Sequence, residues 1–175
     1  TSQNETTVGP ALNALFQQSL RIGKRGHAET GIDRLAPSIV TASFAAAGDV
    51  VDEADTHFLV AGAGTMAKLA VRTLVERGVA PEQIAVANRT FERAQDLAIE
   101  SGVRAVRWEN MDDELAAVDV LISCTGARGV VFDRPRLEAA GGRVTVLIDL
   151  ALPRDIDSAV RDIDGAVGHH IRRQR

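Results

Sequence analysis

The feature that most constrains this chain is a glycine turn placed between a strand pattern and a helix pattern. The run HFLVA, residues 57–61, is short and apolar, as expected of a buried parallel strand, and it ends directly at Gly62. The next residues, GAGTMAKLAV, have G-x-G-x-x-A spacing and open a helix expected over 65–77. A glycine turn in this strand–turn–helix context predicts a site for the diphosphate of a dinucleotide.

Each position of the turn has its own physical task. Gly62 permits the tight turn, Gly64 lets the backbone approach a diphosphate, and Ala67 takes the helix-packing position, where alanine is accepted. The helix that starts at Thr65 points free amides and its positive dipole end toward the phosphates. The alternative is a glycine turn that binds no dinucleotide. The predicted diphosphate-binding residues are Gly62, Ala63, Gly64, Thr65, Met66 and Ala67.

Strand and helix patterns alternate through the rest of the chain. Further strands are expected over 83–87, 103–108, 119–124 and 144–152, with helices over 90–102, 110–118 and 134–142. Alternation at this interval predicts an α/β fold with a doubly wound, Rossmann-like parallel sheet. Ahead of the sheet we expect an amphipathic helix after Pro10, a polar connector over 31–37 and a short helix over 37–48.

The composition excludes several classes of protein. The 175 residues are 45% hydrophobic and 25% charged, as in an ordinary globular protein. The net charge of −4 argues against binding of nucleic acid by the overall charge of the chain. The single cysteine, Cys124, excludes an intramolecular disulfide framework. There is no apolar run long enough to span a bilayer and no metal-binding cluster, so we expect a cytoplasmic protein without a metal or a membrane partner.

The end of the second expected strand indicates which dinucleotide is bound. NAD-binding domains commonly place an acidic residue there to bond the ribose hydroxyls. This chain instead has VANRTFERA, in which Arg89 offers a planar fork of donors to a 2′-phosphate and Arg93 lies one turn further along. NADPH is therefore the predicted cofactor, bound by Asn88, Arg89, Thr90 and Arg93. The alternative makes Asn88 and Thr90 a helix cap and both arginines solvated surface residues.

Two later segments are expected at the same edge of the sheet. ISCTGA ends the fourth strand, so Thr125 and Gly126 are predicted to approach the nicotinamide side of the cofactor. IDLALPRD ends the fifth strand, and its Asp149 is expected in the same crevice. The alternative makes Arg154 a surface partner of Asp155 or of Asp157.

Taken together, these motifs resemble the glutamyl-tRNA reductases, the NADPH-dependent enzymes that open the C5 route to tetrapyrroles. The resemblance rests on LFQQSLRIGKRGHAETGI, VAGAGTMAKLAV, VANRTFERAQDLA and IDLALPRDID, with ISCTGA in agreement, and it covers nearly the whole chain. The first block makes it specific, because the NRT segment alone also suits shikimate dehydrogenases. Gly26 departs from the family, which commonly has an aliphatic residue at that place.

The resemblance implies that catalysis and NADPH binding belong to separate domains. In this family a cysteine of a preceding catalytic domain attacks the glutamyl ester, and the thioester accepts hydride from NADPH to give glutamate-1-semialdehyde. Residues 1–36 would then be the end of the catalytic domain and a connecting helix, 37–168 the NADPH-binding domain, and 169–175 a truncated basic tail. Glutamyl-tRNA would be bound through the absent catalytic domain, the full-length protein would be a homodimer, and its product would pass to an aminomutase.

We expect the chain to bind cofactor without completing the reaction. The family's nucleophile belongs to a segment with no counterpart here, and Cys124 sits in an apolar strand end, where a free cysteine is usually a small core hydrophobe. The four histidines and Trp108 are interpreted as surface or packing residues, and the start at Thr1 suggests a piece of a longer polypeptide. Two other functions stay open: a free-standing NADP(H)-binding regulatory module, and an oxidoreductase resembling shikimate dehydrogenase.

Overall fold

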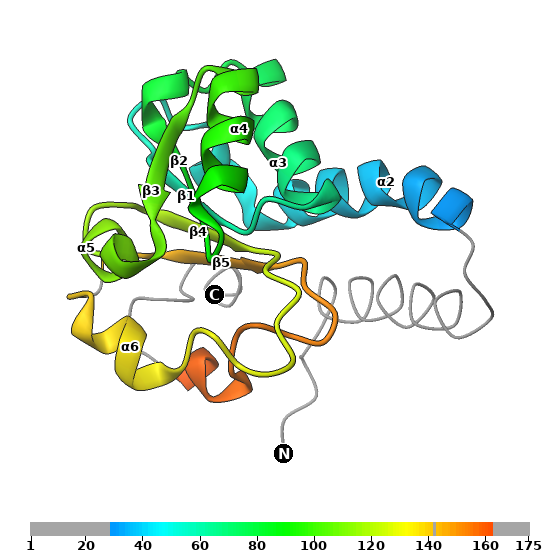
Figure 1. The fold of residues 1–175 in the computed structure, drawn as a ribbon. Helices are drawn as coiled ribbons and strands as arrows, with labels where there is room; N and C mark the ends of the chain where they lie inside the picture. The colour runs from blue at the N-terminus through cyan, green and yellow to red at the C-terminus, as the bar shows by residue number, and fades with distance from the viewer. Residues whose placement is uncertain (1–28, 142, 163–175) are drawn as a thin grey trace.

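The structure, a computed structural model, describes residues 29–141 and 143–162 of the chain. Its centre is a five-stranded parallel sheet with strand order β3-β2-β1-β4-β5 (Figure 1). The strands are β1 (Phe58–Ala61), β2 (Ile84–Asn88), β3 (Arg104–Arg107), β4 (Val120–Ser123) and β5 (Val146–Asp149). The chain moves outward from β1 to β3 and then returns to place β4 on the other side of β1. This reversal is that of a doubly wound sheet, so the predicted fold class is confirmed.

Helices cover both faces of the sheet (Figure 1). One face carries α2 (Glu29–Ala47), α3 (Thr65–Glu76) and α4 (Phe91–Ser101), and the other carries α5 (Met111–Leu115) and α6 (Arg134–Ala139). Four 3-10 turns complete the elements: η1 (Gly48–Asp52), η2 (Pro81–Gln83), η3 (Trp108–Asn110) and η4 (Ser158–Asp162). Because both faces are covered, β1 and β4 are buried along their whole length, which explains their continuous apolar runs.

The register of the sheet brings the carboxyl ends of its strands to one edge. Ala61 at the end of β1 lies opposite Ala87 of β2 on one side and Ser123 of β4 on the other. Ser123 in turn lies opposite Asp149, the last residue of β5. The segments that follow β1, β2, β4 and β5 therefore start from one edge, where ligands bind in open parallel sheets.

The segment before the sheet differs from the sequence prediction. The connector expected over 31–37 and the helix expected over 37–48 form one continuous helix, α2, which runs through Pro37. An apolar stripe continues across the proline, and its part after Pro37 belongs to the core cluster of the sheet. This burial outweighs the local cost of proline inside a helix. The stripe consists of Ala36, Val40, Phe44 and Ala47, all buried.

Two other expectations fall outside the described residues. They are the amphipathic helix after Pro10 and the basic tail 169–175. The expected boundary between 36 and 37 lies inside α2 and stays a prediction, since a continuous helix neither requires nor forbids a change of domain there.

We expect Phe44→Ala to lower the free energy of unfolding by about 3–5 kcal/mol, because the ring is fully buried between α2 and the sheet and its loss leaves a cavity. Thr41→Ala on the exposed side of the same helix is the matched control and should change stability by less than about 0.5 kcal/mol. Urea denaturation of both variants measures the difference. Equal stability of the two variants would show that α2 is not anchored to the sheet.

Candidate functional site

The turn after β1 is held between the ends of two neighbouring strands. The Gly62 amide donates to the Ala87 carbonyl of β2 at 2.7 Å, and the Cys124 amide donates to the Ala61 carbonyl at 2.8 Å. Gly62 has a φ of +124°, and a Cβ at this residue would overlap the backbone carbonyl of Cys124. The fold itself therefore requires glycine at the first position of the motif.

Gly64 is in a different situation. Its φ of −85° is open to any residue, its backbone is exposed, and a Cβ there would meet no protein atom within 4 Å. Neither its conformation nor its neighbours require glycine. The open space beside this backbone fits the close approach of a ligand such as a diphosphate.

The start of α3 has the properties of an anion site. The helix begins at Thr65, no side chain caps it, and its first turn contains no acidic residue. Its first amides therefore keep their hydrogen-bonding capacity and the positive end of the helix dipole for an anion. Ala67 is fully buried in the helix-packing position, and Ala63 and Met66 pack partly against the same core. These residues fit the diphosphate of a dinucleotide.

The segment after β2 combines a closed turn with exposed cations. The Asn88 side-chain amide donates to the Thr90 carbonyl at 2.9 Å, whereas the Thr90 side chain makes no capping bond to α4. The alternative of a helix cap is therefore wrong for Thr90, and the Asn88 bond closes the turn without capping the amides of α4. Arg89 and Arg93 are exposed, and neither forms an ion pair with a described carboxylate. The Arg89 guanidinium lies 5.4 Å from the centroid of the Trp108 ring, so Trp108 packs as expected and also supports this arginine.

A buried carboxylate fixes the loop after β4. Asp155 accepts hydrogen bonds at 2.7 Å from the Ser123 hydroxyl, the Thr125 amide and the Thr125 hydroxyl. The Thr125 hydroxyl also accepts from the Ala127 amide at 3.2 Å. Thr125 therefore holds the loop in place, and the exposed Gly126, with a φ of +65°, lies beside it at the same edge.

Asp155 was expected at the surface, and this is wrong, because the residue is completely buried. Its three donors offset the cost of burying a carboxylate. Asp155 and Ser123 are the site-forming residues that sequence reasoning missed. No pattern in this one sequence distinguishes Asp155 from its neighbour Asp157, because both follow the same turn of IDLALPRDID.

Asp149 turns the chain at the end of β5. Its carboxylate accepts from the amides of Ala151, Asp155 and Ile156 at 3.0–3.1 Å, so the strand stops at Asp149 and not at residue 152 as expected. Burial raises the pKa of Asp149 above its ordinary value, and the negative Asp155 adds to the rise, while the three amide bonds oppose it.

Cys124 lies beside the glycine turn, and its environment disfavours a thiolate. Burial raises the pKa of the Cys124 thiol far above its ordinary value, and the nearby carboxylates of Asp155 and Asp149 raise it further. A thiol in this environment stays protonated at neutral pH. The interpretation of Cys124 as a structural residue is consistent with this environment.

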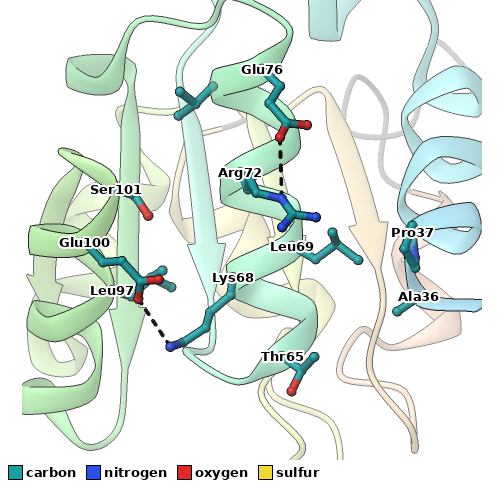
Figure 2. A pocket seen from close by; sticks show the side chains of 11 residues that line it. Ala36, Pro37, Thr65, Lys68, Leu69, Arg72, Glu76, Leu97, Glu100 and Ser101 are labelled. Carbon is teal, nitrogen blue, oxygen red and sulfur yellow. Dashed lines mark hydrogen bonds and ion pairs between the residues drawn. The ribbon is translucent and has the colours of Figure 1, made fainter. Parts of the chain in front are cut away.

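A separate pocket of about 550 Å³ runs along α3 between α2 and α4 (Figure 2). Its apolar part includes Pro37, Leu69 and Leu97, and Thr65 lines it at the start of α3. Two exposed ion pairs lie at its surface. Lys68–Glu100 joins α3 to α4 at 3.3 Å, and Arg72–Glu76 lies along α3 at 3.5 Å. Such paired charges offer no group for catalysis, and the pocket lies outside the carboxyl edge of the strands.

The described residues hold no metal cluster and no membrane-spanning helix. Residues 29–141 and 143–162 contain no group of three or more histidine, cysteine or acidic side chains placed to hold a metal ion. Within the same residues, no helix has the length and apolar character needed to cross a membrane. His57 lies at the amino end of β1, away from the candidate site, where its ring contacts the Asp55 carbonyl and Asp119.

The predicted residues therefore gather at one edge of the sheet from three segments: the turn after β1, the turn after β2 and the loop after β4. They are Gly62, Ala63, Gly64, Thr65, Met66 and Ala67; Asn88, Arg89, Thr90 and Arg93; and Thr125 and Gly126. Their roles toward a cofactor stay predictions. The site that they form can bind an elongated, negatively charged ligand along the edge.

Comparison with known proteins agrees with the geometry. A family model described as shikimate / quinate 5-dehydrogenase matches residues 45–172. The chain is 49% identical over 162 residues to glutamyl-tRNA reductase 1 of Nocardioides sp. and 46% identical over 169 residues to glutamyl-tRNA reductase of Corynebacterium diphtheriae. Both alignments cover 91% of this chain and 37% of the relative, so the chain spans little more than a third of the length of these curated relatives.

Solved structures give the same result. Glutamyl-tRNA reductase from Methanopyrus kandleri matches with a TM-score of 0.60 and 28% identity, covering 88% of this chain and 44% of that chain. The nucleotide-binding domain of glutamyl-tRNA reductase from Thermoplasma volcanium matches with a TM-score of 0.53 and 22% identity, covering 70% of this chain and 79% of that chain, and it supports the fold. The resemblance to glutamyl-tRNA reductases is confirmed.

The two glycines of the turn should respond differently to substitution by alanine. We expect Gly62→Ala to destabilise the fold, because the new methyl group overlaps the Cys124 carbonyl and the residue has a positive φ. Gly64→Ala should leave thermal stability nearly unchanged and weaken dinucleotide binding, because its methyl group enters only the open space. Thermal melts and NADPH titrations of both variants measure this. Unchanged NADPH affinity in Gly64→Ala would place the diphosphate elsewhere.

The raised pKa of Cys124 predicts a pH-dependent loss of stability. The unfolded thiol ionises above about pH 8.5, whereas the folded thiol stays protonated, so the free energy of unfolding should fall as the pH rises through this range. The slope from this one group approaches about 1.4 kcal/mol per pH unit. Cys124→Ala should show a shallower profile than the parent chain between pH 8 and 10 in urea denaturation. Parallel profiles would mean that the folded thiol ionises normally.

Proposed function

This chain belongs to the shikimate / quinate 5-dehydrogenase family, and from its similarity to glutamyl-tRNA reductases we propose that it is the NADPH-binding domain of such an enzyme. The observation that carries the proposal is the carboxyl edge of the sheet. The uncapped start of α3, the open backbone at Gly64 and the exposed arginines after β2 all lie at this edge. A dinucleotide with an extra phosphate on its adenosine ribose has the matching charge and length.

Each part of the edge has a role toward the cofactor. The turn Gly62–Ala67 and the first amides of α3 bind the diphosphate. Arg89, with Asn88 and Thr90 closing the turn and Arg93 beyond it, neutralises the 2′-phosphate and disfavours NADH by leaving its own charge unpaired when that phosphate is missing.

The loop after β4 orients the nicotinamide end. The amide and the hydroxyl of Thr125 both donate to Asp155, so the Thr125 side chain is not free to bind the cofactor. The loop therefore contacts the cofactor through its backbone at the exposed Gly126. Bound NADPH supplies the hydride for reduction. The share of this chain is to bind the cofactor and to hold it in one orientation.

The rest of the reaction belongs to parts of the protein beyond this chain. We propose that the full-length protein binds glutamyl-tRNA through a separate catalytic domain, works as a homodimer in the cytoplasm and passes glutamate-1-semialdehyde to an aminomutase. Within this chain, 37–168 would be the nucleotide domain, 1–36 the end of the catalytic domain with a connecting helix, and 169–175 the start of a basic tail. The isolated chain should bind NADPH and reduce no glutamyl-tRNA, since Cys124 is a partly buried thiol whose raised pKa keeps it protonated.

A reductase acting on a small hydroxy acid is the second candidate, favoured by the description of the family model. The identity to glutamyl-tRNA reductases covers 91% of the chain, however, and includes residues before the nucleotide domain, which supports the first candidate. Assay of the full-length protein with glutamyl-tRNA and with shikimate separates the two.

We expect Arg89→Ala to weaken NADPH binding by about 1.5–3 kcal/mol, which is roughly 10- to 150-fold, and to leave NADH binding nearly unchanged. The reason is loss of a charge-assisted contact that only the 2′-phosphate makes. Arg72→Ala, which removes an exposed arginine paired with Glu76 on α3, is the control and should affect neither nucleotide. Fluorescence titrations measure both affinities. An equal loss for NADPH and NADH would rule out the assigned role of Arg89.

A further inference from the structure

A cluster of arginines with no carboxylate partner among the described residues surrounds the end of β2, and it contains one residue that the sequence motifs did not indicate. We propose that Arg107, the last residue of β3, is a further residue that selects NADPH over NADH by binding the same 2′-phosphate as Arg89. The inference rests on the function proposed above, and it extends the site from one strand end to two.

The first argument is charge. Most basic side chains that the structure describes are paired with a carboxylate, namely Lys68, Arg72, Arg77, Arg104, Arg134, Arg136 and Arg143. Among the described residues, Arg89, Arg93, Arg107 and Arg128 are exposed and appear in no such pair. Arg128 lies in the loop after β4, whereas the other three come from the end of β2, the start of α4 and the end of β3. Cations grouped without counter-charges repel one another, and a bound dianion relieves this repulsion.

The second argument is position. Arg107 is the register partner of Asn88 in the parallel pair β2–β3, so it stands beside the residue that precedes Arg89. Adjacent strands lie about 4.8 Å apart, and side chains from these two ends reach a common ligand. Arg107 belongs to the edge strand of the sheet, and its side chain is exposed among the described residues.

The third argument is support by aromatic rings. The Arg107 guanidinium lies 4.3 Å from the centroid of the Phe91 ring, at the first residue of α4, and the Arg89 guanidinium lies over Trp108, directly after β3. Each arginine thus rests on a ring supplied by the neighbouring segment. Stacking restricts both long side chains while leaving their N–H groups free of carboxylates, so less entropy is lost when an anion binds.

The test compares variants of the whole 175-residue chain. Arg107→Ala removes the proposed contact, and Arg107→Gln keeps most of the stem without the charge. Arg104→Ala is the matched control, because Arg104 lies on the same strand and is exposed but is paired with Glu114. Circular dichroism melts confirm folding, and the affinities for NADPH, NADH, adenosine 2′,5′-bisphosphate and AMP are measured by titration.

We expect both Arg107 variants to weaken NADPH and adenosine 2′,5′-bisphosphate by about tenfold, with less than twofold change for NADH and AMP. The loss should shrink as salt rises from about 0.1 M to 1 M, because screening weakens the contact in the parent chain. Parent-like NADPH affinity in both Arg107 variants would overturn the inference, as would an equal loss for NADH.

The failure of this inference differs from failure of the proposed function. If Arg89→Ala loses the preference for NADPH while both Arg107 variants keep it, only the role of Arg107 is wrong. If the parent chain binds NADPH no better than NADH, the NADPH site itself is wrong and the role of Arg107 falls with it.

Discussion

The close approach of the turn after β1 to the end of β4 is the contact on which the whole carboxyl edge depends. Gly62 bonds to the end of β2 while its α-carbon faces the Cys124 carbonyl with no room for a side chain. This contact fixes where α3 starts and therefore where its free amides point. It also explains why Cys124 has a protonated thiol, since the residue that abuts the turn is enclosed and close to two carboxylates. The absence of a Cβ at Gly62 thus allows the contact that places both the start of α3 and the protonated thiol of Cys124.

The other half of the edge is fixed by polar contacts. The Asp149 carboxylate accepts a hydrogen bond from the backbone amide of Asp155. The Asp155 carboxylate in turn accepts three hydrogen bonds from Ser123 and Thr125. A buried carboxylate tolerates this position only while its donors stay in place, so the loops after β4 and β5 hold each other. The carboxyl edge is therefore held in place by aspartates after β4 and β5, and by the glycine contact after β1.

Some of this could be predicted from the sequence, and the reasons for success and failure are physical. β1, β2 and β4 were predictable from their continuous apolar runs, which strands covered on both faces need, and the glycine turn was predictable from its spacing. The edge strand β3, with an arginine at each end, was predictable only from the regular alternation of strands and helices. α2 was not, because Pro37 marks a helix boundary locally while burial of Phe44 is decided by tertiary packing. The role of Asp155 depends on a contact with residues 30 or more positions away, which one sequence does not show. The stacking of Arg107 on Phe91 is hidden for the same reason.

The structure also separates what the fold needs from what a ligand needs. Gly62 and Ala67 are explained by conformation and packing alone, so they would be found in such a turn even if nothing bound there. Gly64 has neither a positive φ nor a crowded neighbour, and the cations at Arg89 and Arg107 have no carboxylate partners among the described residues. Open backbone and unpaired charge contribute little to stability by themselves. Their concentration along one edge is what a phosphorylated dinucleotide requires, and the argument for a cofactor site is strongest at the residues the fold does not need.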